Sequence, residues 1–279
     1  MIHAWVPTAP CDESCVRDDP VGVTGRAVRF TRGWARVALI LFVLPAMPLT
    51  AIPHPRQSQC VGLYSRLLLA CCGVQIKVSG NKIRDMTGTL VVSPHISWID
   101  VLAIWGVMPG LFVAKADMVK WPGIGLMARM LGVVPIDRTK LRPLPGVVAE
   151  LAAHLRSGRT VVTFPEGSSW CGMAYGRFRP ALFQAAIDAQ RPVQPLGLSY
   201  HHADGRRSTV PAFVGEDTLT RSIWRVVATR STIIEIYVAD RQLPDVDRRE
   251  LARRCQAAVC DSNDLVDWTD AESSIHIAV

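Results

Sequence analysis

The chain has 279 residues, 49% of them hydrophobic and 20% charged, which excludes a mostly disordered protein. Its length suits one large domain or two small ones. Lysine and arginine number 31 against 24 acidic residues, giving a net charge of +7 and a pI near 9.2. This excess favours anionic partners such as lipid head groups, coenzyme phosphates or nucleic acid, without choosing among them.

Residues 1–33 mix Pro, Gly, Asp and Cys without helical or strand periodicity, so we predict a flexible leader. An uncharged apolar stretch follows at 37–52. As a helix, its sixteen residues would span about 24 Å, against about 30 Å for the hydrocarbon core of a bilayer. Pro45 and Pro48 also interrupt a helix there, because proline lacks an amide donor and clashes with the preceding turn.

A second apolar stretch, 61–74, is too short to span a bilayer. We therefore predict that residues 34–79 form a membrane-associated helical hairpin that enters one leaflet. A cleaved secretory signal and a hairpin buried in the core are the alternatives. The arginines that precede the first stretch are predicted to face lipid phosphates: Arg26, Arg29, Arg32 and Arg36.

Beyond Gly80, short β-rich runs alternate with helical stretches, which predicts a layered α/β domain over residues 80–262, followed by a flexible tail at 263–279. The predicted strands are 89–93, 111–115, 133–136, 160–164, 193–198, 210–214 and 233–238. The predicted helices are 98–107, 123–131, 144–156, 180–189 and 247–259.

The run Ser93-Pro94-His95-Ile96-Ser97-Trp98-Ile99-Asp100 stands where a predicted strand ends and a helix begins. His95 and Asp100 cannot share a helical face, because five residues rotate about 500° and leave the side chains about 140° apart. His95 must precede the helix, and with Ser97 as N-cap the turn can fold it back toward the Asp100 carboxylate. Asp100 would then hold one imidazole nitrogen and leave the other as a base. The alternative is a simple capping box.

Two further strand ends carry candidate ligand-binding residues. Arg138 follows the strand at 133–136, at the edge where ligands bind in open α/β sheets, and its planar guanidinium suits phosphate. Its alternative role is a surface ion pair. Glu166 and Gly167 follow the strand at 160–164, where Glu166 can fix the turn or contact a ligand hydroxyl and Gly167 permits close backbone approach. A simple strand-terminating turn is the alternative.

Four blocks follow one another in order: HxSxxD from His95, Pro135-Ile136-Asp137-Arg138, Phe164-Pro165-Glu166-Gly167 and Val193-Gln194-Pro195-Leu196. Over roughly residues 61–238 this set resembles the glycerolipid acyltransferase family that includes the 1-acylglycerol-3-phosphate acyltransferases. The resemblance implies an α/β fold with a mixed sheet flanked by helices. It also implies transfer of a fatty acyl group from acyl-CoA or acyl-carrier protein to a lysophospholipid hydroxyl, with phosphatidic acid as the expected product.

The same resemblance assigns roles and partners. No metal and no bound cofactor is expected, because the thioester already supplies a good leaving group. The expected partners are a membrane lysophospholipid and an acyl thioester, with acyl carrier protein as one potential donor and no nucleic acid. The expected location is the cytoplasmic face of the inner (plasma) membrane. By motif match, the base is His95, its orienting partner Asp100 and the phosphate ligand Arg138, while Glu166, Gly167 and Ser168 shape the acceptor site.

Two departures from the family pattern bear on the acceptor. Pro94 stands where the family commonly has Asn, and Ser168-Ser169 stands where many members have Thr-Arg. Arg177 or Arg179 is the candidate replacement for the missing cation. Relatives that acylate lyso-ornithine lipid often lack that arginine, so lyso-ornithine lipid is the alternative acceptor. A lipase is disfavoured because a GxSxG elbow is missing, and a non-enzymatic basic membrane or nucleic-acid binding protein is a remote alternative.

The cysteines do not form a regular framework, which favours a reducing compartment. Cys11 and Cys15 have the spacing of the start of a metal knuckle, but no nearby CxxC or histidine pair completes four ligands, so we predict no zinc site. Cys171 is predicted to be a small buried hydrophobic residue and not an acyl-accepting nucleophile, since no local feature indicates a depressed thiol pKa.

Overall fold

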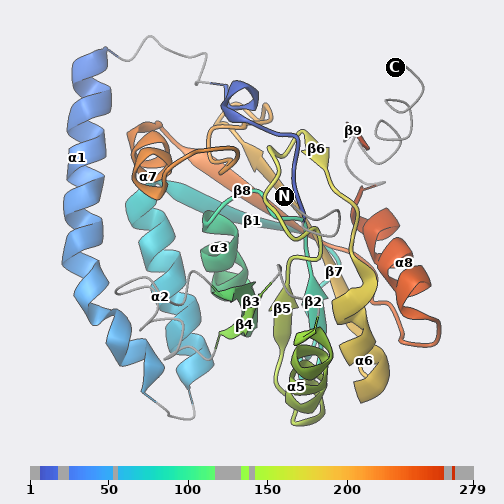
Figure 1. Ribbon diagram of the computed structural model, residues 1–279. Helices are drawn as coiled ribbons and strands as arrows, with labels where there is room; N and C mark the ends of the chain where they lie inside the picture. Colours follow the sequence, from blue (N-terminus) through green and yellow to red (C-terminus); the bar gives the residue numbers. More distant parts are fainter. Residues whose placement is uncertain are drawn as a thin grey trace, which may run out of the picture.

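Figure 1 shows the computed structural model of the protein, which describes residues 7–17, 25–52, 56–116, 133–137, 142–260 and 266–267. Within these residues, a seven-stranded sheet has the order β1-β8-β7-β2-β5-β3-β4, and only β7 and β8 pair antiparallel. The predicted mixed sheet is confirmed. Its strands are β1 (Val74–Gly80), β2 (Leu90–Val92), β3 (Leu111–Lys115), β4 (Val134–Ile136), β5 (Val161–Thr163), β7 (Val193–His201) and β8 (Thr232–Val238).

Helices cover both faces of the sheet (Figure 1). Strand β2 contributes to the core on both faces of the sheet. Val91 belongs to one buried cluster, and Leu90 and Val92 belong to the other, because successive side chains of a strand point to opposite faces. The first cluster includes residues of α2 (Gln57–Cys72), α3 (Ile99–Val107) and α7 (Leu219–Ala228). The second includes residues of α5 (Leu144–Arg156), α6 (Gln184–Ala189) and α8 (Arg248–Cys260).

The segment 210–214 is not a strand, contrary to the prediction. Val210, Ala212 and Val214 are buried, and this alternation produced the strand-like pattern. The carbonyl oxygens of Val210 and Ala212 instead accept hydrogen bonds from the Arg225 guanidinium, at 2.7 and 2.6 Å. A side chain on α7 thus occupies the acceptors that a neighbouring strand would need.

Several elements were not predicted. All of strand β1 except Gly80 falls in the segment assigned to the hairpin. Most of its side chains are exposed at the sheet edge, so its sequence lacks a clear apolar alternation. Helix α7 was also missed. Within the predicted leader, η1 (Glu13–Cys15) is ordered and α1 begins at Arg26. A short parallel pair joins β6 (Ala174–Tyr175) to β9 (Val266–Asp267) inside the predicted tail. The predicted helix 123–131 lies outside the described residues.

Helix α1 (Arg26–Val43) lies along the edge of the molecule beside α2 and α7 (Figure 1). It approaches α7 at Gly33, where an added Cβ would lie 2.8 Å from the Trp224 ring. Arg36 donates hydrogen bonds to the carbonyls of Val227, Thr229 and Arg230 at the end of α7, at 2.5–2.9 Å. Such contacts satisfy carbonyl groups that a helix end leaves without partners. Arg36 therefore docks α1 to the domain instead of facing lipid.

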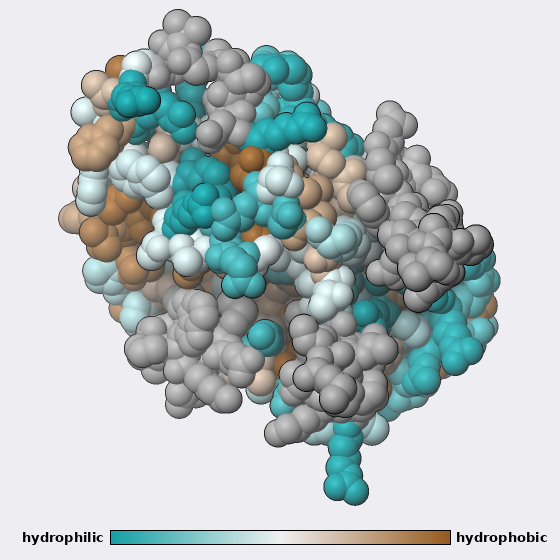
Figure 2. Space-filling view, turned by 45° about the horizontal axis from the view of Figure 1, so that its top comes forward, coloured by the Kyte–Doolittle hydropathy of each residue, from teal (hydrophilic) through white to brown (hydrophobic). Residues whose placement is uncertain are grey.

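The outer side of the hairpin is apolar and exposed. The segment Arg26–Thr50 is long and apolar enough to cross a membrane by length and composition, and 17% of its apolar window is buried, so this first stretch is not part of the core. The second stretch does not enter a leaflet as predicted: in α2, Val61, Leu69 and Cys72 are buried in the first core cluster. Phe42 is 84% exposed. Figure 2 shows brown apolar surface on the side where Figure 1 places α1. As the two prolines predict, α1 gives way to a 3₁₀ helix, η2 (Leu44–Ala51).

Candidate active site

The pairing of β2 with β5 brings two of the predicted site residues together. These strands are parallel, with Val92 opposite Thr163. His95 follows Val92 by three residues and Glu166 follows Thr163 by three residues, so both lie just beyond the same sheet edge. The backbone amide of His95 donates to Glu166 Oε2 at 2.7 Å. The carboxyl ends of the central strands therefore form the site, as is usual for ligand sites in open α/β sheets.

The His95 side chain faces the carboxylate of Asp100. Nδ1 of the ring lies 2.9 Å from Asp100 Oδ2, and the same oxygen accepts the amides of Ile96 at 2.7 Å and Ser97 at 2.8 Å. Asp100 is fully buried. A buried carboxylate surrounded by donors accepts a proton-bearing Nδ1, which leaves Nε2 of a neutral ring as an acceptor.

The start of α3 differs from the predicted capping box in one respect. Its N-cap is Trp98, one residue later than predicted, and no side chain caps it. Ser97 Oγ accepts the Ile99 amide at 3.4 Å, while the Ser97 amide bonds to the Asp100 carboxylate. Asp100 thus fixes both the entry to the helix and the ring of His95, so a structural role of this motif does not exclude the predicted chemical one.

Tyr200, which the sequence analysis missed, completes the surroundings of Asp100. Its hydroxyl donates to Asp100 Oδ1 at 2.6 Å, and the side chain is buried at the end of β7. Burial and the adjacent carboxylate raise the pKa of Tyr200 well above its usual value, so the hydroxyl keeps its proton. The available signal was the alternation Leu196, Leu198, Tyr200 along one face of a strand.

The His95 ring is held by packing but remains accessible. It stacks on Phe164, with ring centroids 4.1 Å apart and planes 17° apart. The backbone carbonyl of His95 accepts the Trp170 amide at 2.7 Å. The side chain is 23% exposed, whereas Asp100 is inaccessible. The ring is therefore partly accessible while its Nδ1 is fixed by Asp100.

Glu166 has a positioning function in this geometry. Its two oxygens accept the amides of His95 at 2.7 Å and Gly176 at 2.8 Å, which ties the loop after β5 to the loop after β2. Burial raises the pKa of Glu166 to about 8, although the two amide hydrogen bonds oppose that rise. Because both oxygens bond to the backbone, Glu166 acts on the loop that carries His95, in agreement with the prediction that it fixes this turn.

The remaining predicted site residues lie around the same turn. Gly167 has φ +80°, a conformation that favours glycine, and an added Cβ there would lie 2.5 Å from Pro7. Arg179 extends beside it, with Cδ 3.9 Å from that Cβ position. Ser168 Oγ is buried and has no hydrogen-bond partner among the described residues. Arg138 lies outside the described residues, so its assignment stays a prediction.

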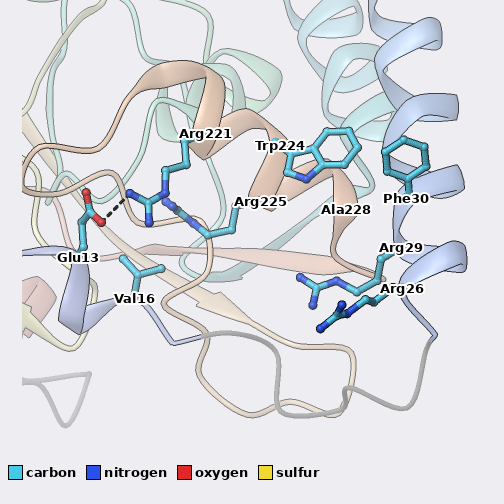
Figure 3. A pocket seen from close by; sticks show the side chains of 9 residues that line it. All are labelled: Glu13, Val16, Arg26, Arg29, Phe30, Arg221, Trp224, Arg225 and Ala228. Atoms are coloured by element: carbon cyan, nitrogen blue, oxygen red, sulfur yellow. Dashed lines mark hydrogen bonds and ion pairs between the residues drawn. The ribbon is translucent and has the colours of Figure 1, made fainter.

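A separate basic cavity of about 440 Å³ lies between α1, α7 and the N-terminal segment (Figure 3). Figure 3 shows Arg26 and Arg29 extending into it from α1, while Arg221 pairs with Glu13 at 2.6 Å on its other side. Phe30 adds an aromatic wall next to the exposed face of the helix. The cavity offers guanidinium groups to an anion at the boundary between apolar and polar surface.

The chain matches proteins of one enzyme family. The sequence model of the family described as Acyltransferase matches residues 75–199. The chain is 30% identical over 184 residues to the 1-acyl-sn-glycerol-3-phosphate acyltransferase of Neisseria meningitidis serogroup B, covering 66% of this chain and 71% of the relative. It is 31% identical over 198 residues to the lyso-ornithine lipid O-acyltransferase of Pseudomonas aeruginosa, covering 69% of this chain and 73% of the relative.

A solved structure agrees in fold. The crystal structure of the 1-acyl-sn-glycerophosphate acyltransferase PlsC from Thermotoga maritima aligns with a TM-score of 0.61 at 18% sequence identity, covering 84% of this chain and 95% of that chain. At this identity the likeness shows the mixed α/β architecture, and the chemistry rests on the sequence relatives and on the geometry at the sheet edge.

Proposed function

Since the chain belongs to the glycerolipid acyltransferase family and is an O-acyltransferase for lysolipids, we propose that it acylates 1-acyl-sn-glycerol-3-phosphate to phosphatidic acid with a His95–Asp100 dyad. The observation that carries this proposal is the 2.9 Å contact from His95 Nδ1 to the buried carboxylate, with the ring still accessible. No other part of the described site combines a base with an orienting acid in this way.

His95 is the general base of the proposed reaction. Asp100 holds the proton on Nδ1, so Nε2 takes the proton of the acceptor hydroxyl as its oxygen attacks the thioester carbonyl. The new ester C–O bond forms, the C–S bond breaks, and the imidazolium returns the proton to the departing thiolate. A base of this kind contributes about 10²–10⁴-fold to the rate.

Asp100 and Tyr200 hold the base in place. The carboxylate receives the imidazole, two backbone amides and the tyrosine hydroxyl, which fixes its direction in a site closed to water. When the ring becomes an imidazolium, the same carboxylate stabilises the new charge. The base therefore needs no rearrangement of its surroundings during transfer.

The acceptor phosphate is expected to bind beyond Gly167. Arg138 is the phosphate ligand by motif, and Arg179, which lies beside Gly167, supplies a second cation in place of the arginine that the family pattern has after Gly-Thr. The buried hydroxyl of Ser168, without a partner among the described residues, is proposed to bond to the acceptor. Lyso-ornithine lipid is the second candidate acceptor, favoured by Ser168-Ser169 and by relatives of that name.

The donor and the location complete the proposal. Acyl-CoA or acyl-carrier protein supplies the acyl group, and the reaction needs no bound cofactor because the thioester is already activated. The apolar face of α1 enters the cytoplasmic leaflet of the inner membrane, where the lysolipid is concentrated. The exposed Phe42 and the cavity arginines support this orientation.

The test uses purified full-length protein with lysophosphatidic acid and lyso-ornithine lipid in parallel, each with oleoyl-CoA and oleoyl-carrier protein, and mass spectrometry of the lipid products. We expect phosphatidic acid, and expect Arg179→Gln to raise KM for lysophosphatidic acid about tenfold, since one charged hydrogen bond contributes about 1.5 kcal/mol. If only acylated ornithine lipid forms, lyso-ornithine lipid is the acceptor and the proposal of lysophosphatidic acid is wrong. Failure with both acceptors would refute the assignment.

A further inference from the structure

Three cysteines that are far apart in the sequence meet beside the active-site loop. Cys11 and Cys15 come from the N-terminal segment, and Cys171 comes from the loop that follows Glu166. Their three sulfur atoms all lie within 4.8 Å of one another. Cys11 and Cys171 are buried and Cys15 is partly exposed. The sequence analysis discounted zinc because it considered only ligands near Cys11 and Cys15, whereas the fold supplies a third.

Hydrogen-bond donors surround the sulfur of Cys171. The Cys11 thiol hydrogen-bonds to Cys171, as do the backbone amides of Met173 and Ala174. Amide donors directed at sulfur are the outer contacts that metal-bound thiolates commonly have. Cys171 is buried, as predicted, and Cys11 reaches it only through the fold.

We propose that Cys11, Cys15 and Cys171 bind one Zn²⁺ ion as thiolates. Zinc–sulfur bonds of about 2.3 Å place tetrahedral sulfur ligands about 3.8 Å apart, so each sulfur needs to move by about 1 Å at most from its position here. The thiol protons pass to solvent on binding. Among the described residues, these three sulfur atoms are the ligand atoms that lie together. Water takes the fourth position, on the side of the partly exposed Cys15.

The ion would fasten the N-terminal segment to the loop that supports His95. The N-terminal segment already contacts the domain on either side of its two cysteines. Before Cys11, Pro7 lies against Gly167, and after Cys15 the Arg17 amide donates to Thr209 Oγ1 at 2.9 Å. From Cys171 the chain leads back to Trp170, whose amide bonds to the carbonyl of His95. Zinc at this junction would tie the N-terminal segment to this loop, and its loss would loosen the support of the active site without removing His95 or Asp100.

The test measures metal in the full-length protein purified with and without added Zn²⁺ under reducing conditions. We expect one zinc per chain by elemental analysis, and a Co²⁺-substituted protein with sulfur-to-cobalt charge-transfer absorption. Cys15→Ser, at the partly exposed position, should weaken zinc binding at least tenfold in chelator competition while the fold is kept. Cys60→Ser, at an exposed cysteine of α2, is the matched control and should leave binding unchanged.

Two results would overturn the proposal. One is wild-type protein that holds less than about a tenth of an equivalent of zinc after incubation with Zn²⁺ and reductant. The other combines two observations. The intact mass of the reduced wild-type protein shows two of the three thiols joined as a disulfide, and the Cys15→Ser and Cys60→Ser variants have the same zinc content. The measurement on the wild-type chain decides the matter even where a Cys11 or Cys171 variant fails to fold, and it is independent of acyl-transfer activity.

Discussion

Two substitutions at His95 separate its proposed chemical role from its structural one. His95→Ala removes the base and also the hydrogen bond to Asp100. His95→Asn removes the base, but its side-chain amide can still donate from nearly the position of Nδ1 to the carboxylate 2.9 Å away. Both variants should therefore lose acyl transfer, whereas only the alanine variant should lose substantial stability.

The magnitudes follow from the geometry. Loss of a general base lowers the rate about 10²–10⁴-fold in both variants. In His95→Ala the fully buried carboxylate loses one of four donors, which costs about 1.5–3 kcal/mol in the free energy of unfolding for a bond to a charged group. In His95→Asn this donor is kept, and we expect a loss below about 1 kcal/mol.

The assay is the initial rate of thiol release from oleoyl-CoA in lysolipid-containing micelles, with denaturant unfolding of the same preparations. His154→Asn is the matched control, because that histidine on α5 has a side chain 25% exposed, close to the 23% of His95, and lies outside the site. A His95→Asn enzyme that keeps more than a tenth of the wild-type rate would refute the role of the ring as base.

Further predictions concern the support of the site and the membrane face. Tyr200→Phe removes the 2.6 Å bond to Asp100 and should lower the free energy of unfolding by about 1.5–3 kcal/mol, measured with denaturant. Glu166 has a folded pKa of about 8 against 4.5 in the unfolded chain, so the folded state binds more protons between these values. Stability should fall between pH 5 and 8, by up to about 1.4 kcal/mol per unit, and Glu166→Gln should flatten this slope in thermal scans. Changing Arg26 and Arg29 together to Gln should weaken flotation with anionic vesicles about 30-fold, at about 1 kcal/mol per charge, and leave binding to neutral vesicles unchanged.

The dyad was predictable because it is local. His95 and Asp100 are five residues apart, and helix geometry alone forces the histidine to precede the helix that carries the acid. Tyr200 was not predictable in the same way. It reaches Asp100 only because β7 pairs with β2, with Pro195 opposite Val92, and strand order is a property of the whole fold.

The function of Glu166 shows the same limit. The sequence places it after a strand, and its role in fixing a turn followed from that position. Its partner, the amide of His95, depends on the register that sets Val92 opposite Thr163. The meeting of Cys171 with the N-terminal segment likewise depends on tertiary contacts between distant parts of the chain. Local patterns thus identify reactive groups, while the sheet order decides which of them touch.

Only some of the arginines of α1 are available to an anionic surface. Arg32 and Arg36, predicted to face lipid phosphates, donate to carbonyl groups at the end of α7 and so stabilise the junction of the two helices. Arg26 and Arg29 instead extend into the cavity beside Phe30, next to the exposed apolar face. If α1 binds anionic lipid as proposed, the attraction is therefore expected from a short band at the start of the helix.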